Sequence, residues 1–338
     1  MKFVSFSTPT QKERVGLWIQ GQVYDLAQEG ERANVILPKN ILELLEESEK
    51  YFPLCLMLEK SIEEKKAKHE AVSEYTLLAP VPKPTSCRDA YAFRQHVETM
   101  RKNRGAEMSP EFDQFPVFYF TNHNAIVGPG NIELERDHFE KMDFELEVAI
   151  VVGKRGINIA AKDADEYIFG YTIMNDLSAR QLQMEEMKLS LGPAKGKDFG
   201  TVIGPYLVTR DELESRSIAS EEGQRFDMRM IAKHNGELIS EGNLKSMNWT
   251  FAQILERVSY GVEIFPGDVI GSGTVGTGCY AEINGTAARK AAENKEDYEP
   301  RWLKEGDSIE LEVEGLGILS NTLERKKVDY SIFEKKKV

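Results

Sequence analysis

The sequence is poor in cysteine and in basic residues and has no long apolar run, and each shortage excludes a class of protein. Its longest apolar runs, such as residues 167–174, fall far short of the roughly 20 residues that a membrane-spanning helix needs. The three cysteines, Cys55, Cys87 and Cys279, are widely spaced, which excludes a disulfide-rich fold and a paired-cysteine zinc motif and indicates reduced thiols. We assign these cysteines no function from the sequence.

The charge balance argues against two kinds of partner. The chain has 56 acidic and 43 basic residues, for a net charge of −13. Nucleic acids and anionic membranes both require a basic surface, so neither is expected as a partner. With 338 residues, 41% of them hydrophobic, the chain has the composition of a globular protein of one large domain with an appendage, or of two domains. The first six residues alternate as in a strand and show no secretory signal, so we expect a cytoplasmic protein.

A proline-rich segment divides the chain. Before it, short strands are expected within residues 2–26, and helical periodicity within 41–68 is interrupted at Pro53. Three closely spaced prolines beginning at Pro80 cannot lie inside a helix or a central strand and favour an extended linker. We therefore predict a small N-terminal domain, residues 1–79, and a second domain, residues 80–338.

The second domain has mainly the pattern of strands. Apolar or alternating runs predict strands at 117–121, 144–152, 167–175, 226–234, 237–241 and 308–313. Helices are predicted at 91–102, 178–188 and 250–260. The pair Asn235-Gly236 favours the positive φ angles of a tight turn, which predicts a hairpin between its flanking strands.

Two glutamates in one predicted strand are the first candidates for a site. Glu145 and Glu147 are two residues apart, so in a strand they share one face while Phe144, Leu146 and Val148 share the other. One interpretation is an acidic face in contact with water. The other is a pair of oxygen ligands held together by a hard cation such as Mg²⁺, Mn²⁺ or Ca²⁺. Zinc is less favoured, because no histidine or cysteine clusters here.

Two further acids lie at positions where a site is expected. Asp176 follows an apolar strand and precedes a helix, where an acid is either a helix cap or a ligand. Asp89 lies seven residues before His96. If that stretch is helical, the two side chains share a face about 10 Å apart, which suits a metal ligand and a base on either side of a small substrate.

Five blocks of the sequence resemble, in content and order, motifs of the fumarylacetoacetate hydrolase family. The blocks are DAYAFRQH (89–96), FELEVA (144–149), MNDLSAR (174–180), GKDFGT (196–201) and GSGT (271–274). The similarity extends from about residue 77 to about residue 318. It implies an α+β, mostly β fold, in which a rolled mixed β-sandwich catalytic domain follows a small N-terminal α+β domain. It also implies a homodimer, which is common among relatives.

The resemblance assigns roles to acidic residues and to one histidine. Asp89, Glu145, Glu147 and Asp176 would bind a divalent metal, Mg²⁺ or else Mn²⁺ or Ca²⁺. His96 would be the general base, oriented by a glutamate. The candidate for that glutamate is Glu282, late in the chain, and the alternative is Glu98, the acid nearest to His96.

The resemblance also indicates cationic and polar residues that contact substrate. Arg180 and Gln183 are three residues apart and share a helix face. With Lys197, they would donate hydrogen bonds to an oxygen that develops negative charge. Lys197 is favoured over its neighbour Lys195 because it lies in the Gly-Lys-Asp-Phe pattern. Two further residues, Tyr91 and Thr274, match positions that contact substrate.

The activity implied is metal-dependent hydrolysis of a C–C bond in a fumarylacetoacetate-like or acylpyruvate-like diketo acid, in aromatic catabolism. The partner is then a small anionic oxo acid. An alternative within the family is a lyase or isomerase: an oxo-diacid decarboxylase or isomerase, or a sugar-acid dehydratase. A metal-stabilised binding protein is a third possibility, but a structural site needs neither a base nor oxyanion donors.

Overall fold

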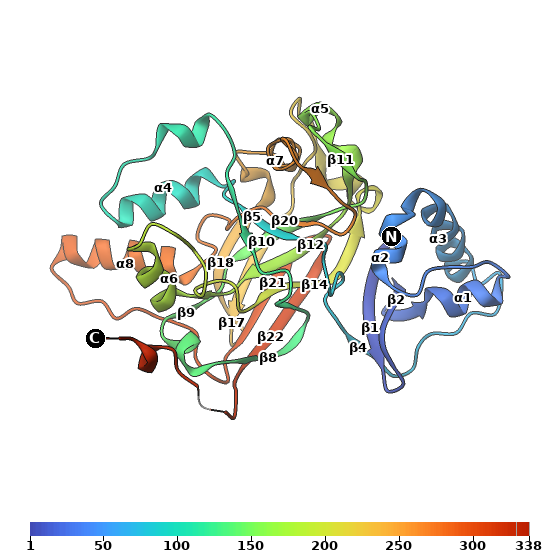
Figure 1. The fold of residues 1–338 in the computed structure, drawn as a ribbon, viewed down its shortest axis with the longest axis horizontal. Coiled ribbons are helices and arrows are strands. Elements are labelled where there is room, and N and C mark those ends of the chain that lie inside the picture. Colours follow the sequence, from blue (N-terminus) through green and yellow to red (C-terminus); the bar gives the residue numbers. More distant parts are fainter. Residues whose placement is uncertain (329, 338) are drawn as a thin grey trace.

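The computed structural model describes residues 1–328 and 330–337 and contains two large β-sheets with helices around them (Figure 1). The larger sheet contains β1 (Lys2–Thr8), β2 (Gln11–Ile19), β3 (Gln22–Asp25), β4 (Thr76–Leu77), β5 (Cys87–Ala90), β6 (Phe118–Thr121), β7 (Ile126–Val127), β10 (Leu146–Val152), β12 (Ile168–Asp176), β14 (Thr201–Thr209) and β20 (Val269–Gly271). The second sheet contains β8 (Gly130–Leu134), β17 (Arg229–His234), β18 (Glu237–Asn243), β21 (Ser308–Val313) and β22 (Gly317–Arg325).

The described chain also contains α-helices and small strand pairs outside the two large sheets. The helices are α1 (Leu26–Arg32), α2 (Ile41–Glu46), α3 (Ser48–Glu63), α4 (Arg94–Asn103), α5 (Ala161–Ala164), α6 (Arg180–Met187), α7 (Phe251–Val258) and α8 (Tyr280–Asn294). Small strand pairs are formed by β9 (Met142–Asp143) with β13 (Ser178–Ala179), β11 (Gly156–Ile157) with β19 (Glu263–Ile264), and β15 (Ser217–Ile218) with β16 (Arg225–Phe226). Within the described residues, none of the helices is long and apolar enough to cross a membrane.

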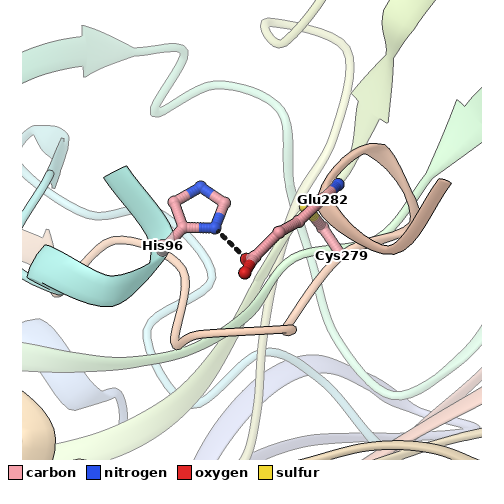
Figure 2. A group of neighbouring side chains, drawn as sticks. All are labelled: His96, Cys279 and Glu282. Carbon is pink, nitrogen blue, oxygen red and sulfur yellow. Dashed lines mark hydrogen bonds and ion pairs between the residues drawn. The ribbon is translucent and has the colours of Figure 1, made fainter. Parts of the chain in front are cut away.

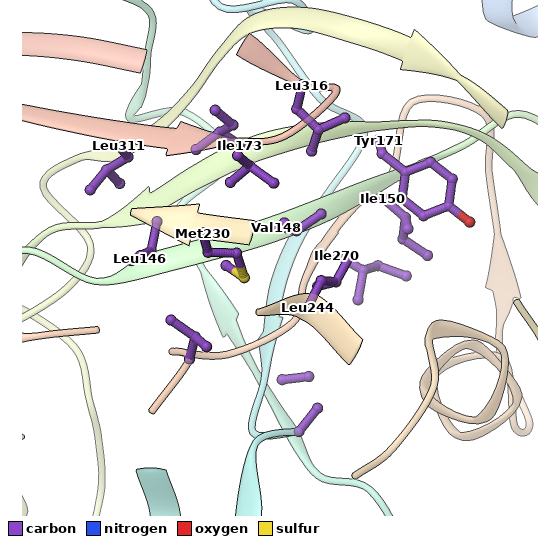
Figure 3. Packing of buried hydrophobic residues seen from close by; sticks show 14 of the residues in the cluster. Leu146, Val148, Ile150, Tyr171, Ile173, Met230, Leu244, Ile270, Leu311 and Leu316 are labelled. Carbon is purple, nitrogen blue, oxygen red and sulfur yellow. The ribbon is translucent and has the colours of Figure 1, made fainter. Parts of the chain in front are cut away.

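The two sheets pack face to face around a common core. The larger sheet runs in the order β3-β2-β1-β14-β12-β10-β20-β5-β6, and the second in the order β18-β17-β21-β22-β8. Leu146, Val148 and Ile150 of β10 point into the core between the sheets, where they meet Met230 of β17 and Leu311 of β21 (Figure 3). The fold is therefore the predicted α+β, sheet-dominated sandwich.

The other face of the larger sheet is covered as well. Ala149 and Val151 of β10 belong to a second core, which includes Leu44 of α2 and Leu58 of α3. Because both faces of β10 are buried, a polar side chain on this strand has no access to bulk water and needs partners within the protein.

The N-terminal strands continue the larger sheet, because β1 pairs with β14. In Figure 1 residues 1–79, in blue, lie at one side of the molecule. The proposed division between residues 1–79 and 80–338 therefore crosses a shared sheet, and the boundary stays a prediction. The expected interruption at Pro53 is wrong, because Pro53 lies inside α3 and the break falls between Glu46 and Ser48. Pro53 lies close to the start of α3, so its missing N–H and its ring affect only the short stretch of helix that precedes it.

The predicted hairpin is confirmed. His234 pairs with Glu237, and the two turn residues have φ angles of 50° at Asn235 and 79° at Gly236. Helix α7 also agrees with its expected range, and the hydroxyl of Thr250 caps it by accepting a hydrogen bond from the backbone N–H of Gln253.

Packing between the sheets predicts a large effect for a truncation in β21. Leu311 is 1% exposed in the core between the sheets, so Leu311→Ala should lower the free energy of unfolding by about 2–5 kcal/mol. Ile318 of β22 is 48% exposed, so the matched variant Ile318→Ala should change it by less than about 0.5 kcal/mol. Urea denaturation of the two variants measures the difference. Equal losses would contradict this account of the core.

Candidate functional site

The four acids singled out in the sequence converge at the middle of the larger sheet. Asp89 lies on β5, Glu147 on β10, Asp176 at the end of β12, and Glu145 one residue before β10. Their exposed fractions are 3%, 0%, 0% and 6%. The interpretation of Glu145 and Glu147 as an acidic face in contact with water is therefore wrong.

Sheet order explains the convergence, because β12, β10, β20 and β5 are consecutive neighbours. Gly271 of β20 is paired with Asp89 and separates β5 from β10. A Cβ added at Gly271 would overlap an oxygen of Asp89 and lie 3.1 Å from Glu147 Oε2. The glycine thus leaves open the space that the carboxylates share.

The carboxylates have the composition and spacing of a hard-cation site. One oxygen from each of Asp89, Glu145 and Glu147 lies within 4.8 Å of the others. Among the described residues, Glu147 Oε2 and Asp176 Oδ1 are buried without a hydrogen-bond partner. An all-oxygen set with unpartnered buried oxygens suits Mg²⁺, Mn²⁺ or Ca²⁺. The residues present therefore fit the divalent metal that the family implies.

Burial and mutual repulsion shift the pKa values of these acids. Burial, reinforced by the charge of Asp176, raises the pKa of Asp89 to about 7. Burial and the neighbouring Asp89 raise the pKa of Glu147 well above its usual range. Burial also raises the pKa of Asp176. The raised pKa values indicate that the cations of the protein balance the charge of the four acids only in part.

Two buried cations partly balance the acids. Lys197 Nζ donates to Glu145 Oε2 at 2.5 Å and to Asp176 Oδ2 at 2.7 Å. Arg180 Nη2 donates to Glu145 Oε1 at 2.7 Å. Burial alone would raise the pKa of Glu145, but Lys197 and Arg180 lower it to about 2. Lys195, the alternative to Lys197, is exposed and pairs with Asp198.

The remaining predicted residues lie around this centre. Arg180 Nη1 donates to Gln183 Oε1 at 2.9 Å, which confirms that the two residues share a helix face. Thr274 Oγ1 donates to Glu147 Oε1 at 3.3 Å. The ring of Tyr91 stands edge-on to that of His96, with centroids 5.9 Å apart.

His96 is paired with Glu282, not with Glu98. His96 Nδ1 and Glu282 Oε2 are 2.6 Å apart, and both side chains are buried (Figure 2). Glu98 is exposed on α4. The backbone N–H of Thr277 also donates to Glu282 Oε2, at 2.9 Å, which holds the carboxylate in place.

Close packing of α4 against α8 positions this pair. A Cβ at Gly285 of α8 would lie 2.7 Å from the Asn103 amide nitrogen of α4, so the glycine permits the close approach of the two helices. The helical path expected between Asp89 and His96 is wrong, because Asp89 is part of β5 and α4 begins only at Arg94. Strand pairing with β20 overrides the helical pattern there.

Two residues of the site were not found in the sequence. Asp143 accepts from Arg180 Nε at 2.8 Å and from the backbone N–H groups of Tyr280 and Ala281 at the start of α8. It lies two residues before Glu145, so extending the alternating acids by one step would have found it. Tyr119 of β6 donates its hydroxyl to Asp176 Oδ2, and no sequence pattern marks it.

Known proteins resemble this chain over most of its length. The family described as Fumarylacetoacetate (FAA) hydrolase C-terminal matches residues 85–324. Oxaloacetate tautomerase YisK of Bacillus subtilis is 28% identical over 297 residues, covering 85% of this chain and 87% of that protein. The mitochondrial oxaloacetate tautomerase Fahd2a of Rattus norvegicus is 29% identical over 328 residues, covering 95% and 91%.

Solved structures share the fold. The fumarylacetoacetate hydrolase from psychrophilic Exiguobacterium antarcticum matches with a TM-score of 0.66 at 24% identity, over 96% of this chain and 100% of that one. The family match covers more than half of the chain and includes the acids, Lys197 and the His96–Glu282 pair. The chain therefore belongs to the fumarylacetoacetate hydrolase family.

Proposed function

We propose that this protein is a divalent-metal-dependent enzyme that interconverts the keto and enol forms of an oxaloacetate-like 2-oxo acid. The observation that carries the proposal is the buried His96–Glu282 pair, which interacts electrostatically with Glu145 of the acid cluster. A site that shifts a proton next to a ketone needs a base and a means of stabilising the enolate. The two relatives named above are oxaloacetate tautomerases and resemble this chain over most of its length.

Asp89, Glu145, Glu147 and Asp176 would hold the metal. When bound, a divalent cation supplies Lewis-acid polarisation of the 2-oxo group and balances negative charge on its oxygen. Lys197 and Arg180 hold Glu145 ionised, since both donate to it. They therefore keep one ligand of the set ready for a cation and add positive charge where an anionic substrate would bind.

His96 would carry the proton. Its Nδ1 faces Glu282, so the carboxylate selects the tautomer with the proton on Nδ1 and leaves Nε2 as the acceptor. Nε2 would take a proton from the carbon next to the ketone, and a proton returned to the ketone oxygen gives the enol. Substrate and product then have the same atoms. Burial of the pair excludes water, which favours proton transfer over addition of water.

Hydrolysis of a C–C bond in a diketo acid is the second candidate. It is supported by the same Nε2, which would take a proton from water if a water molecule entered the site with the substrate. It also needs Arg180, Gln183 and Lys197 as oxyanion donors. Arg180 and Lys197 already donate to acids, and the carbonyl oxygen of Gln183 accepts from Arg180, so the geometry favours tautomerisation.

The homodimer and the cytoplasmic location implied by the sequence stay predictions. The relative from Rattus norvegicus is described as mitochondrial, so location varies among family members.

Metal binding predicts a stability change that depends on Glu147. Mg²⁺ or Mn²⁺ at about 100 times its Kd should raise the free energy of unfolding by about 2.7 kcal/mol. Glu147→Gln should abolish most of this gain, because it removes the negative charge and replaces one carboxylate oxygen of a buried ligand that has an unpartnered atom. Thermal unfolding with and without metal measures the effect. Glu49→Gln, at a side chain 91% exposed on α3, is the control and should keep the full gain.

Loss of the base predicts a loss of turnover without a loss of metal binding. His96→Gln should lower kcat for oxaloacetate tautomerisation by about 10²–10⁴-fold. The metal-dependent gain in thermal stability should remain, because His96 is not among the four acids. His123→Gln, at an exposed histidine, is the control. Decay of the enol absorbance in the presence of Mg²⁺ measures the rate.

The same assay separates the two candidate reactions. A panel of oxaloacetate, acylpyruvates and fumarylacetoacetate is offered to the metal-loaded protein, and products are identified by NMR. Accelerated enol decay without new carboxylic acids supports tautomerisation. Cleavage of a diketo acid into two acids, with no acceleration of enol decay, would replace the proposal with hydrolysis.

A further inference from the structure

A cysteine lies beside the His96–Glu282 pair and plays no part in the proposed reaction. Cys279 directly precedes α8, and its Sγ accepts a hydrogen bond from the backbone N–H of Glu282 at 3.4 Å. Nitrogen, sulfur and oxygen atoms of His96, Cys279 and Glu282 lie within 4.8 Å of one another. Figure 2 shows the three side chains gathered where α4 meets the start of α8. All three are buried.

This cluster differs in chemistry from the four acids. The acids offer only oxygen, which suits hard cations. His96, Cys279 and Glu282 offer one atom each of nitrogen, sulfur and oxygen, a set that suits Zn²⁺ and leaves a fourth position open for water. An ion would lie about 2.0–2.3 Å from each ligand atom. It would therefore separate His96 Nδ1 from Glu282 Oε2, which are 2.6 Å apart.

We propose that His96, Cys279 and Glu282 form a second cation site that binds Zn²⁺ and that its occupation inhibits the enzyme. Zinc at this place would replace the hydrogen bond between His96 and Glu282 and remove the imidazole from proton transfer. The inhibition rests on the proposed function. The binding itself rests only on the three side chains and is tested separately.

A nucleophilic role for Cys279 is less consistent with its surroundings. Burial, with the charge of Asp143 adding to it, raises the pKa of the thiol well above its usual range. The thiol is therefore protonated and unreactive towards substrate. Zinc would displace that proton on binding, which is the usual course when a thiol becomes a metal ligand.

The conservative variant Cys279→Ser isolates the sulfur. A serine hydroxyl retains a cap for the start of α8 and removes the soft ligand. Cys55→Ser is the matched control, since Cys55 is a buried free cysteine on α3. Glu147→Gln is a second control, because it weakens the site made by the four acids and leaves the cluster at Cys279 unchanged.

The experiment uses the whole chain, which is first stripped of metal and then saturated with Mg²⁺. This protein is titrated with Co²⁺, a spectroscopic substitute for zinc, and then with Zn²⁺. We expect a near-ultraviolet sulfur-to-cobalt absorption band in the wild type, in Cys55→Ser and in Glu147→Gln, and none in Cys279→Ser. Competition with a chromogenic chelator should show that Cys279→Ser weakens Zn²⁺ binding at least about tenfold. Mutation of residues that only hydrogen-bond to a metal ligand already lowers metal affinity by about that factor. Absence of the band in folded wild type, or its persistence in Cys279→Ser, would overturn the site.

Turnover measured in parallel tests the inhibition. With Mg²⁺ saturating, Zn²⁺ should lower the rate of the wild type, and the ratio of inhibited to uninhibited rate should be closer to one in Cys279→Ser. Equal inhibition of both proteins would overturn the inhibitory role. If the cobalt band appears but no oxo acid is turned over, the proposed function fails and the binding site stands. If turnover is found without the band, the zinc site alone fails.

Discussion

Repulsion among four buried carboxylates is the constraint on which the rest of the site depends. Asp89, Glu145, Glu147 and Asp176 lie together on strands with little or no access to water. Negative charges in such a place are stable only when cations balance them. Lys197 and Arg180 balance Glu145 and part of Asp176, while Asp89 and Glu147 have raised pKa values. The charge still to be balanced is what a divalent cation would supply under the proposed function.

The two sheets give this arrangement its rigidity. Alternate residues of β10 serve two purposes. Leu146, Val148 and Ile150 fill the core between the sheets (Figure 3). Glu147 alternates with them and so lies on the opposite face of the strand, with Ala149 and Val151. A shift of register by one residue would exchange these faces, so the hydrophobic core fixes the position of the acid. The His96–Glu282 pair is supported differently, by the packing of α4 against α8. Asp143 links the two parts, because it holds both Arg180 and the start of α8.

Local patterns in the sequence were sufficient to predict contacts between residues that are close together in the chain. The strand period placed Glu145 and Glu147 on one face, the helix period brought Arg180 to Gln183, and the pair Asn235-Gly236 specified a turn. In each case the interacting residues are at most three positions apart or belong to one turn, so backbone geometry alone determines their relation.

Contacts between distant segments needed the fold or the family resemblance. His96 and Glu282 are 186 positions apart, so the preference for Glu282 over Glu98 came from the family resemblance, and the packing of α4 against α8 then showed the contact. A helical path from Asp89 to His96 was considered, because the pairing of Asp89 with β20 leaves no local signal. The proximity of Cys279 to His96 was hidden for the same reason, although Glu282 follows it by only three residues.

The central claim is that the four acids share one divalent cation. Diffraction from crystals soaked in Mn²⁺, with the anomalous signal of manganese measured, tests it most directly. The account predicts one strong peak between Asp89, Glu145, Glu147 and Asp176, lost in crystals of Glu147→Gln. A peak elsewhere, or clear density for the four carboxylates with no peak among them, would contradict it.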